Sequence, residues 1–289
     1  MAPSSNPPPF DTIWLGVHKT GTTFLQKCLD LSQPALRAHG VHYFDLAEFR
    51  RLYTRPLLHL NHPDPPAPPL SRDARHRLVF DENILALVQH ALGDAALYPD
   101  AANRATSVAN HLGLTKPRVV LGLRSFRTFL PSLYGEALKS TPFRPFRAFN
   151  VTHATHLSWN NLITRLIAAF PGSPVLCYAA EDLRGHERDL LTQIADLPPD
   201  AVSLITGSER PGFSDAAVRA LHDLAEQRPV TRDDVSAQAR QFPRLAGVAA
   251  YNPWTDAEAI ALDQRYTADL ASIRRRPEVQ FINLASRAL

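Results

Sequence analysis

The chain has 289 residues, of which 45% are hydrophobic, and its 31 basic residues nearly balance 28 acidic ones. This length suits one large α/β domain or two small ones; because no Gly/Ser-rich linker divides the sequence, we expect one domain over residues 11–289. A net charge of only +3 excludes a chain-wide basic surface for nucleic acid. No window approaches the roughly 20 apolar residues of a transmembrane helix.

The N-terminus and the cysteines bear on where the protein works. Residues 1–10 are rich in Pro and Ser and lack the basic and apolar regions of a signal peptide, so we expect a disordered tail. Cys28 and Cys177 have no metal-ligand neighbours, which favours buried free thiols in a reducing compartment over a disulfide. These features predict a cytoplasmic protein.

The most informative stretch begins with an apolar run at residues 12–17 and continues through a small-residue turn into a helical pattern. A strand, a tight turn and a helix N-terminus together predict a phosphate cradle. Lys19 supplies a full charge, Gly21 permits close backbone approach, and the Thr22 and Thr23 hydroxyls suit helix capping or phosphate oxygens. The alternative is a helix N-terminus that carries Lys and Thr by coincidence. Because Lys19 precedes Gly21, the loop departs from the nucleotide-hydrolysing P-loop, which disfavours an ordinary kinase or ATPase.

Helices and short strands alternate after this loop. Helical patterns cover residues 24–31, 35–39 and 45–53, with a short strand at 40–44. Five prolines among eight residues exclude regular structure about 62–70, where we expect a surface loop. This loop is either an inert insertion or a rim over a pocket.

Three polar residues follow the next predicted strand, at 77–80. Asp81, Glu82 and Asn83 stand where that strand ends and a helix over 84–97 begins. Carboxylates at the carboxyl end of a parallel strand lie where open α/β sheets place their sites. Asp81 also suits an N-cap and Glu82 a first helical turn, so both interpretations stay open.

The second half of the chain continues the alternation. Helices are predicted over 101–112, 125–139, 153–170, 186–195, 214–227 and 256–275, and strands at 118–124, 174–183 and 279–282. Apolar strands alternating with helices predict a three-layer α/β fold in which helices flank a mainly parallel central sheet.

Two motifs in this order resemble the sulfotransferases that use 3′-phosphoadenosine 5′-phosphosulfate (PAPS). Lys19-Thr20-Gly21-Thr22-Thr23-x-Leu25-Gln26 resembles their 5′-phosphosulfate loop, and Arg124 followed eight positions later by Ser132 resembles their 3′-phosphate motif. Physically, an arginine at a strand end offers a fork of donors to a dianion, and a serine two turns into the next helix can reach the same group. Tyr134 matches the Ser-x-Tyr of the family. Arg-x7-Ser is weak alone, but it becomes specific when paired with the loop.

The resemblance implies a P-loop-type fold similar to bacterial sulfotransferases, PAPS as co-substrate, no metal, and a set of site residues. Lys19 would stabilise the leaving phosphate, and Glu82 would be the base, in preference to His18, His59 or His62. Ala180 stands where many members have a tyrosine, which leaves the adenine contact open, and Glu181 and Asp182 are expected to be structural. The implied nucleotide-binding residues are His18, Lys19, Thr20, Gly21, Thr22, Thr23, Arg124, Ser132 and, from a late Gly/Arg loop, Arg210.

The sequence therefore predicts transfer of a sulfuryl group from PAPS to a hydroxyl or amine of an acceptor. Carbohydrate, lipid and small-molecule acceptors all remain open. The alternatives are a kinase-like P-loop enzyme, an inactive PAPS-binding protein, and a structural or interaction module. No heptad pattern indicates an oligomeric state.

Overall fold

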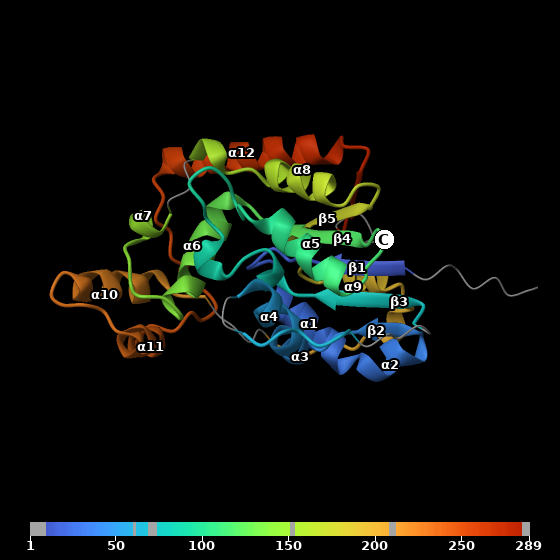
Figure 1. Cartoon of the computed structure of the whole chain (residues 1–289). Coiled ribbons are helices and arrows are strands. Elements are labelled where there is room, and N and C mark those ends of the chain that lie inside the picture. The colour runs from blue at the N-terminus through green and yellow to red at the C-terminus, as the bar shows by residue number, and fades with distance from the viewer. Residues whose placement is uncertain (1–9, 60–61, 69–73, 151–153, 208–211, 285–289) are drawn as a thin grey trace, which may run out of the picture.

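The computed structural model describes residues 10–59, 62–68, 74–150, 154–207 and 212–284. Within them, six strands form one sheet in the order β2-β3-β1-β4-β5-β6, and every neighbouring pair is parallel. The strands are β1 (Phe10–Trp14), β2 (Val41–Tyr43), β3 (His76–Phe80), β4 (Arg118–Leu123), β5 (Val175–Ala179) and β6 (Val279–Phe281). Helices cover both faces of this sheet (Figure 1), so the predicted three-layer α/β fold is confirmed.

Each face of the sheet has its own apolar core. Successive strand residues point to opposite faces, so Ile13 and Val119 enter one core while Trp14 and Val120 enter the other. Because both faces are covered, the central strands are continuous apolar runs in the sequence. One core is closed by α5 (Ala101–His111), α6 (Phe126–Leu138), α8 (Trp159–Ala169) and α12 (Asp256–Arg274), and the other by α1 (Thr22–Leu31), α2 (Gln33–Ala38) and α9 (Glu187–Ala195).

The remaining elements are short or lie at one end of the molecule. Two helices, α10 (Asp215–Ala225) and α11 (Arg232–Gln241), pack on each other near α6 and α7, away from the sheet (Figure 1). A group of short elements precedes β3 in the chain: α3 (Leu46–Phe49), a π-helical turn at Arg50–Thr54 and α4 (Arg55–Leu58). The other short pieces are α7 (Phe146–Phe149) and 3₁₀ turns at Glu82–Ile84, Val88–His90, Ala154–His156, Ala180–Asp182 and Pro199–Ala201.

The strand order fixes where a site can form. The chain places β2 and β3 on one side of β1, then crosses to place β4, β5 and β6 on the other. The loop that follows β1 therefore lies where the direction of strand addition reverses, at the carboxyl edge of a parallel sheet. In open α/β folds this edge is the usual place for a ligand.

The predicted helix over residues 84–97 is wrong. The segment contains only two 3₁₀ turns, because Arg104 of α5 donates to the carbonyl oxygens of Asn83 and Ile84 at 2.9 and 3.0 Å. Those carbonyls are the acceptors that a helix would use for its own ladder. Gly93 N also bonds Ala96 O at 3.1 Å, which closes a tight turn within the predicted helix.

Smaller differences concern boundaries. The helix predicted over 153–170 begins at Trp159, because the Ser158 side chain accepts from Asn161 N and caps it there. Phe10, predicted in the tail, begins β1, whereas residues 1–9 lie outside the described residues. In the Pro-rich loop, residues 62–68 are irregular as predicted, and 69–70 lie outside the described part. Cys28 and Cys177 are buried and free, as predicted.

Candidate active site

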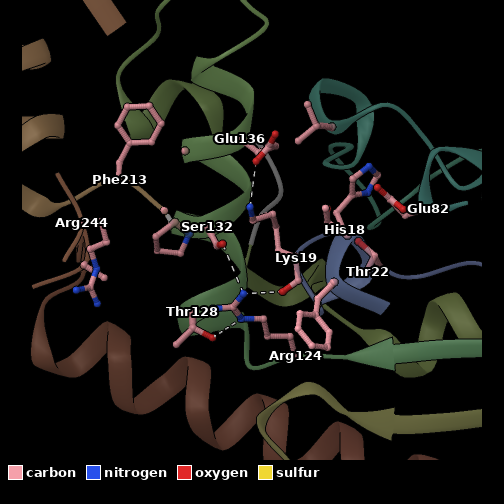
Figure 2. A pocket seen from close by; sticks show the side chains of 18 of the residues that line it. His18, Lys19, Thr22, Glu82, Arg124, Thr128, Ser132, Glu136, Phe213 and Arg244 are labelled. Atoms are coloured by element: carbon pink, nitrogen blue, oxygen red, sulfur yellow. Dashed lines mark hydrogen bonds and ion pairs between the residues drawn. The ribbon is translucent and has the colours of Figure 1, made fainter. Parts of the chain in front are cut away.

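A cleft of about 1450 Å³ opens at the carboxyl edge of the sheet (Figure 2). His18 follows β1, Glu82 follows β3 and Arg124 follows β4, and all three line this cleft. We call the wall formed by the loop after β1, together with Arg124 and α6, the β1 side. The residues after β3, with the side chains that bind them, form the β3 side.

The loop after β1 ends at a helix start whose backbone N–H groups are not capped by a side chain. Gly21 is the N-cap of α1 with φ of 82°, and no side chain caps the first turn, so the Thr22 and Thr23 hydroxyls do not cap α1. This positive φ favours glycine at the position, whereas the nearest atom to an added Cβ is the movable end of the Leu183 side chain, Cδ2 at 2.7 Å. With no capping side chain, the N–H groups at this helix start suit an anion.

Arg124 joins the loop to helix α6. Its Nη1 donates to the Lys19 carbonyl at 2.6 Å and reaches Ser132 Oγ at 3.5 Å, while Nε donates to Thr128 Oγ1 at 3.0 Å. These partners are neutral, and within the described residues no carboxylate lies within ion-pair distance of Arg124. The predicted pair of Arg124 and Ser132 is thus assembled beside the loop, around a guanidinium able to take an anion.

The Lys19 side chain runs toward α6. Its Nζ forms an ion pair with Glu136 Oε2 at 3.0 Å, and Figure 2 shows Lys19 lying between Glu136 and Arg124. Burial lowers the pKa of the Lys19 ammonium, and the Glu136 charge opposes this shift. Burial alone would raise the pKa of Glu136, but Lys19 and Lys139 outweigh it and hold that pKa at about 2.

The β3 side is a closed network of charges. Arg50 donates to Asp81 Oδ1 at 2.7 Å and to Glu82 Oε1 at 3.0 Å, and Gln26 Nε2 donates to Glu82 Oε2 at 2.9 Å. Asp81, which is fully buried, also accepts from Thr54 Oγ1 at 2.7 Å. Burial favours neutral Glu82, but the Arg50 charge opposes it, and the pKa of the Glu82 carboxyl lies below its ordinary value. Asp81 also accepts from Asn83 N, so it caps the turn as predicted.

His18 sits between the two sides with both ring nitrogens bonded. Its Nε2 lies 3.2 Å from Asn83 Oδ1 and its Nδ1 lies 3.0 Å from the Tyr98 hydroxyl. With the Asn83 amide oriented in this way, Nε2 carries the proton and Nδ1 accepts from Tyr98. Burial lowers the pKa of His18, so the ring is neutral at neutral pH.

The cleft brings together most of the predicted residues. Those that line it are His18, Lys19, Gly21, Thr22, Thr23, Glu82, Arg124 and Ser132. Thr20 is buried and its hydroxyl donates to Val17 O at 2.7 Å, so its side chain faces the protein interior. Arg210 lies outside the described residues, and His59 and His62 do not line the cleft. Glu181 accepts from Ser125 N and the Tyr266 hydroxyl, the structural role expected for it.

Other lining residues carry no local sequence signal. Arg50 and Glu136 reach the site from a π-helical turn and from the last turn of α6. Arg244, from the loop after α11, lies across the cleft from Thr128 and Ser132 (Figure 2). Like Arg124, it has no carboxylate partner among the ion pairs of the described residues, although its Nη1 donates to Leu245 O at 3.0 Å. Thr128 is the exception: it lies four residues after Arg124 at a helix start, a spacing that places the two side chains on the same face.

Two kinds of feature are absent from the described residues. Among them, no three or more His, Cys, Asp or Glu side chains cluster so as to hold a metal ion. The helices in this part of the chain are also too short or too polar to span a membrane.

Comparison with known proteins gives a distant likeness to solved structures. No family model matches the chain, and no curated protein does. Among solved structures, the crystal structure of a sulfotransferase from Alicyclobacillus acidocaldarius is similar to it at 14% identity and a TM-score of 0.41. The match covers 83% of this chain and 97% of that one. Neither the donor nor the acceptor of this chain follows from a likeness of that level.

Proposed function

We propose that the protein is a sulfotransferase that moves a sulfuryl group from PAPS to a hydroxyl or amine of an acceptor. The observation that carries this proposal is the position of Arg124, whose guanidinium contacts both the Lys19 carbonyl and Ser132. One cleft thus combines a loop suited to a 5′-phosphosulfate with an arginine–serine pair suited to a 3′-phosphate.

The residues of the β1 side fit such a nucleotide. The helix start at Gly21, Thr22 and Thr23 offers N–H donors without a capping side chain, in a turn whose positive φ favours glycine. Arg124 and Arg244 supply guanidinium groups with no carboxylate partner among the described residues. Two separated anionic groups on one ligand match this distribution of donors better than a single anion does.

In-line transfer makes the bridging phosphate oxygen negative as the sulfuryl group leaves. We assign stabilisation of that charge to Lys19 and to the backbone N–H groups of residues 20–23, which are fixed before the reaction starts. The acceptor must lose a proton, and we assign this step to Glu82. Its low pKa keeps it ionised, and it lines the cleft on the β3 side. His18 is less suited, because its single acceptor lone pair, on Nδ1, is already bonded to Tyr98, whereas each Glu82 oxygen keeps a second lone pair beyond its bond to Arg50 or Gln26.

A thermal-shift titration with adenosine 3′,5′-bisphosphate, the expected product, tests the nucleotide site. A ligand that binds only the folded state raises the melting temperature. We expect a shift in the wild type that is much smaller at the same ligand concentration in Lys19→Ala and Arg124→Ala. It should persist in Arg228→Ala, which removes an exposed arginine paired with Asp234 away from the cleft. A shift only with ATP and magnesium would instead favour the kinase-like alternative.

Transfer from radiolabelled PAPS to carbohydrate, lipid, phenol and amine acceptors then tests the chemistry. Sulfated product that disappears in Lys19→Ala and Glu82→Gln would support the assignment. Binding of the bisphosphate without transfer to any acceptor would identify an inactive PAPS-binding protein.

A further inference from the structure

The β1 side carries one carboxylate that the proposed reaction does not use. Glu136 lies on α6, one helical turn after Ser132, and lines the cleft. Its Oε2 accepts a hydrogen bond from Lys19 Nζ at 3.0 Å and another from Lys139 Nζ at 3.0 Å. A carboxylate at this place repels the phosphates of a nucleotide, so anion binding does not account for it.

The pair with Glu136 uses the ammonium that the proposed reaction needs elsewhere. The Lys19 and Glu136 side chains are 18% and 23% exposed, so solvent screens their attraction only partly. In the reaction proposed above, the Lys19 ammonium must instead meet a phosphate oxygen beside the loop N–H groups. Lys19 therefore has to exchange one anionic partner for another when a nucleotide binds.

Lys139 makes this exchange favourable. Breaking a buried ion pair is strongly destabilising when it leaves one charge without a partner. Here Lys139, three residues after Glu136 on the same helix, already binds the same carboxylate oxygen. When Lys19 leaves, Glu136 keeps a cation, and the negative charge facing the nucleotide remains compensated.

We infer that Glu136 is a positioning residue that holds Lys19 on α6 while the nucleotide site is empty, and that Lys139 retains Glu136 when nucleotide draws Lys19 away. This inference rests on the proposed function. Its consequence is that binding includes the work of separating Lys19 from Glu136, so the affinity for nucleotide is lower than the donors of the cleft alone would give.

The role of Glu136 in holding Lys19 is tested by measuring nucleotide affinity in single and double variants. Adenosine 3′,5′-bisphosphate is titrated to millimolar concentration by thermal shift, so that weak variants are still measured. We expect Glu136→Gln to bind about fivefold more tightly than wild type, and to leave affinity unchanged in a Lys19→Met background. Glu187→Gln removes another carboxylate of the same cleft, one that accepts from Gly185 N, and should change affinity by less than about twofold.

The Lys139 variants test the second half of the inference. Lys139→Met should weaken binding several-fold when Glu136 is present and have no effect in Glu136→Gln. Equal loss in both backgrounds would show that Lys139 contacts the nucleotide directly, and the retention role would be wrong. Tightening by Glu136→Gln that persists in Lys19→Met would show plain charge repulsion and overturn the inference, as would unchanged or weaker binding in Glu136→Gln alone. A wild type that does not bind the bisphosphate would contradict the proposed function itself.

Discussion

The two sides of the cleft differ in how their charges are satisfied. On the β3 side, the carboxylates of Asp81 and Glu82 share the Arg50 guanidinium, and neutral donors fill their remaining positions. On the β1 side, Arg124 bonds only neutral oxygens, and the start of α1 has no capping side chain. The β3 side pairs its charges within the protein, whereas the donors of the β1 side suit an anion. Substitutions on the β3 side should therefore affect stability or the reaction rate more than nucleotide affinity, and those on the β1 side should affect what the protein binds.

The largest effect on stability should come from Asp81→Ala. It leaves the Arg50 guanidinium with Glu82 alone and takes the acceptor from Thr54 Oγ1 and Asn83 N, and removing one member of such a buried network lowers the free energy of unfolding by about 3–5 kcal/mol. Urea unfolding of the nucleotide-free protein measures this. Glu48→Ala breaks a neighbouring pair with Arg51 in which both side chains are more than 60% exposed, and should lower it by less than about 1 kcal/mol. Equal losses in the two variants would mean that the network does not support the β3 side.

Glu82→Gln should separate chemistry from binding. A general base contributes about 10²–10⁴-fold to rate, so kcat should fall by that factor while the affinity for the bisphosphate stays unchanged. The amide keeps the shape of the side chain and one oxygen that accepts from Arg50, at the expense of the acceptor that Gln26 Nε2 uses in the wild type. Rates measured with saturating PAPS, beside a Glu48→Gln control, decide the point. Transfer at the wild-type rate would remove Glu82 from the mechanism.

Arg124→Lys should have the opposite profile. Lysine keeps the charge but loses the fork that spans Thr128, Ser132 and the Lys19 carbonyl. We expect affinity for the bisphosphate to fall about tenfold, which is about 1.4 kcal/mol, while the unfolding free energy without nucleotide changes by less. Isothermal titration and urea unfolding measure the two quantities. Lost stability with unchanged affinity would make the guanidinium a structural brace and erase the contrast between the two sides.

The same contrast explains what could be predicted from sequence. The loop after β1 and the Arg124–Ser132 spacing are local: each lies within one turn or helix, so residue order alone places the groups. The strands were equally accessible, because burial on both faces makes them continuous apolar runs. The motifs and the strands can therefore be predicted because each depends on residues that are close together in the sequence.

The missed contacts are long-range. Arg50 meets Asp81 across 31 residues, His18 meets Tyr98 across 80, and Lys19 meets Glu136 across 117. No local period encodes these partners. The apolar residues after Asn83 read as a helix, because the sequence gives no sign that Arg104 takes the carbonyls the helix would need. Side chains that reach the cleft from irregular segments, such as Arg244, carry no pattern at all.

The smallest predicted effect lies at the junction of the two sides, in Tyr98→Phe. The Tyr98 hydroxyl accepts from His18 N at 3.3 Å and bonds Nδ1 at 3.0 Å, so removing it frees the Nδ1 lone pair in a buried place. Burial lowers the pKa of His18, and the neutral ring is favoured in the folded protein as pH falls through its ordinary range near 6.5. Without the hydroxyl, protonation of Nδ1 is opposed less, and this pKa should rise. An imidazolium beside Glu82 would make that carboxylate a poorer base. The acid limb of the pH profile of kcat should therefore move to higher pH. At pH 8, kcat should fall only about fivefold, which is about 1 kcal/mol. A purely structural role would lower stability and leave the profile in place, which would detach His18 and Tyr98 from the chemistry assigned to the β3 side.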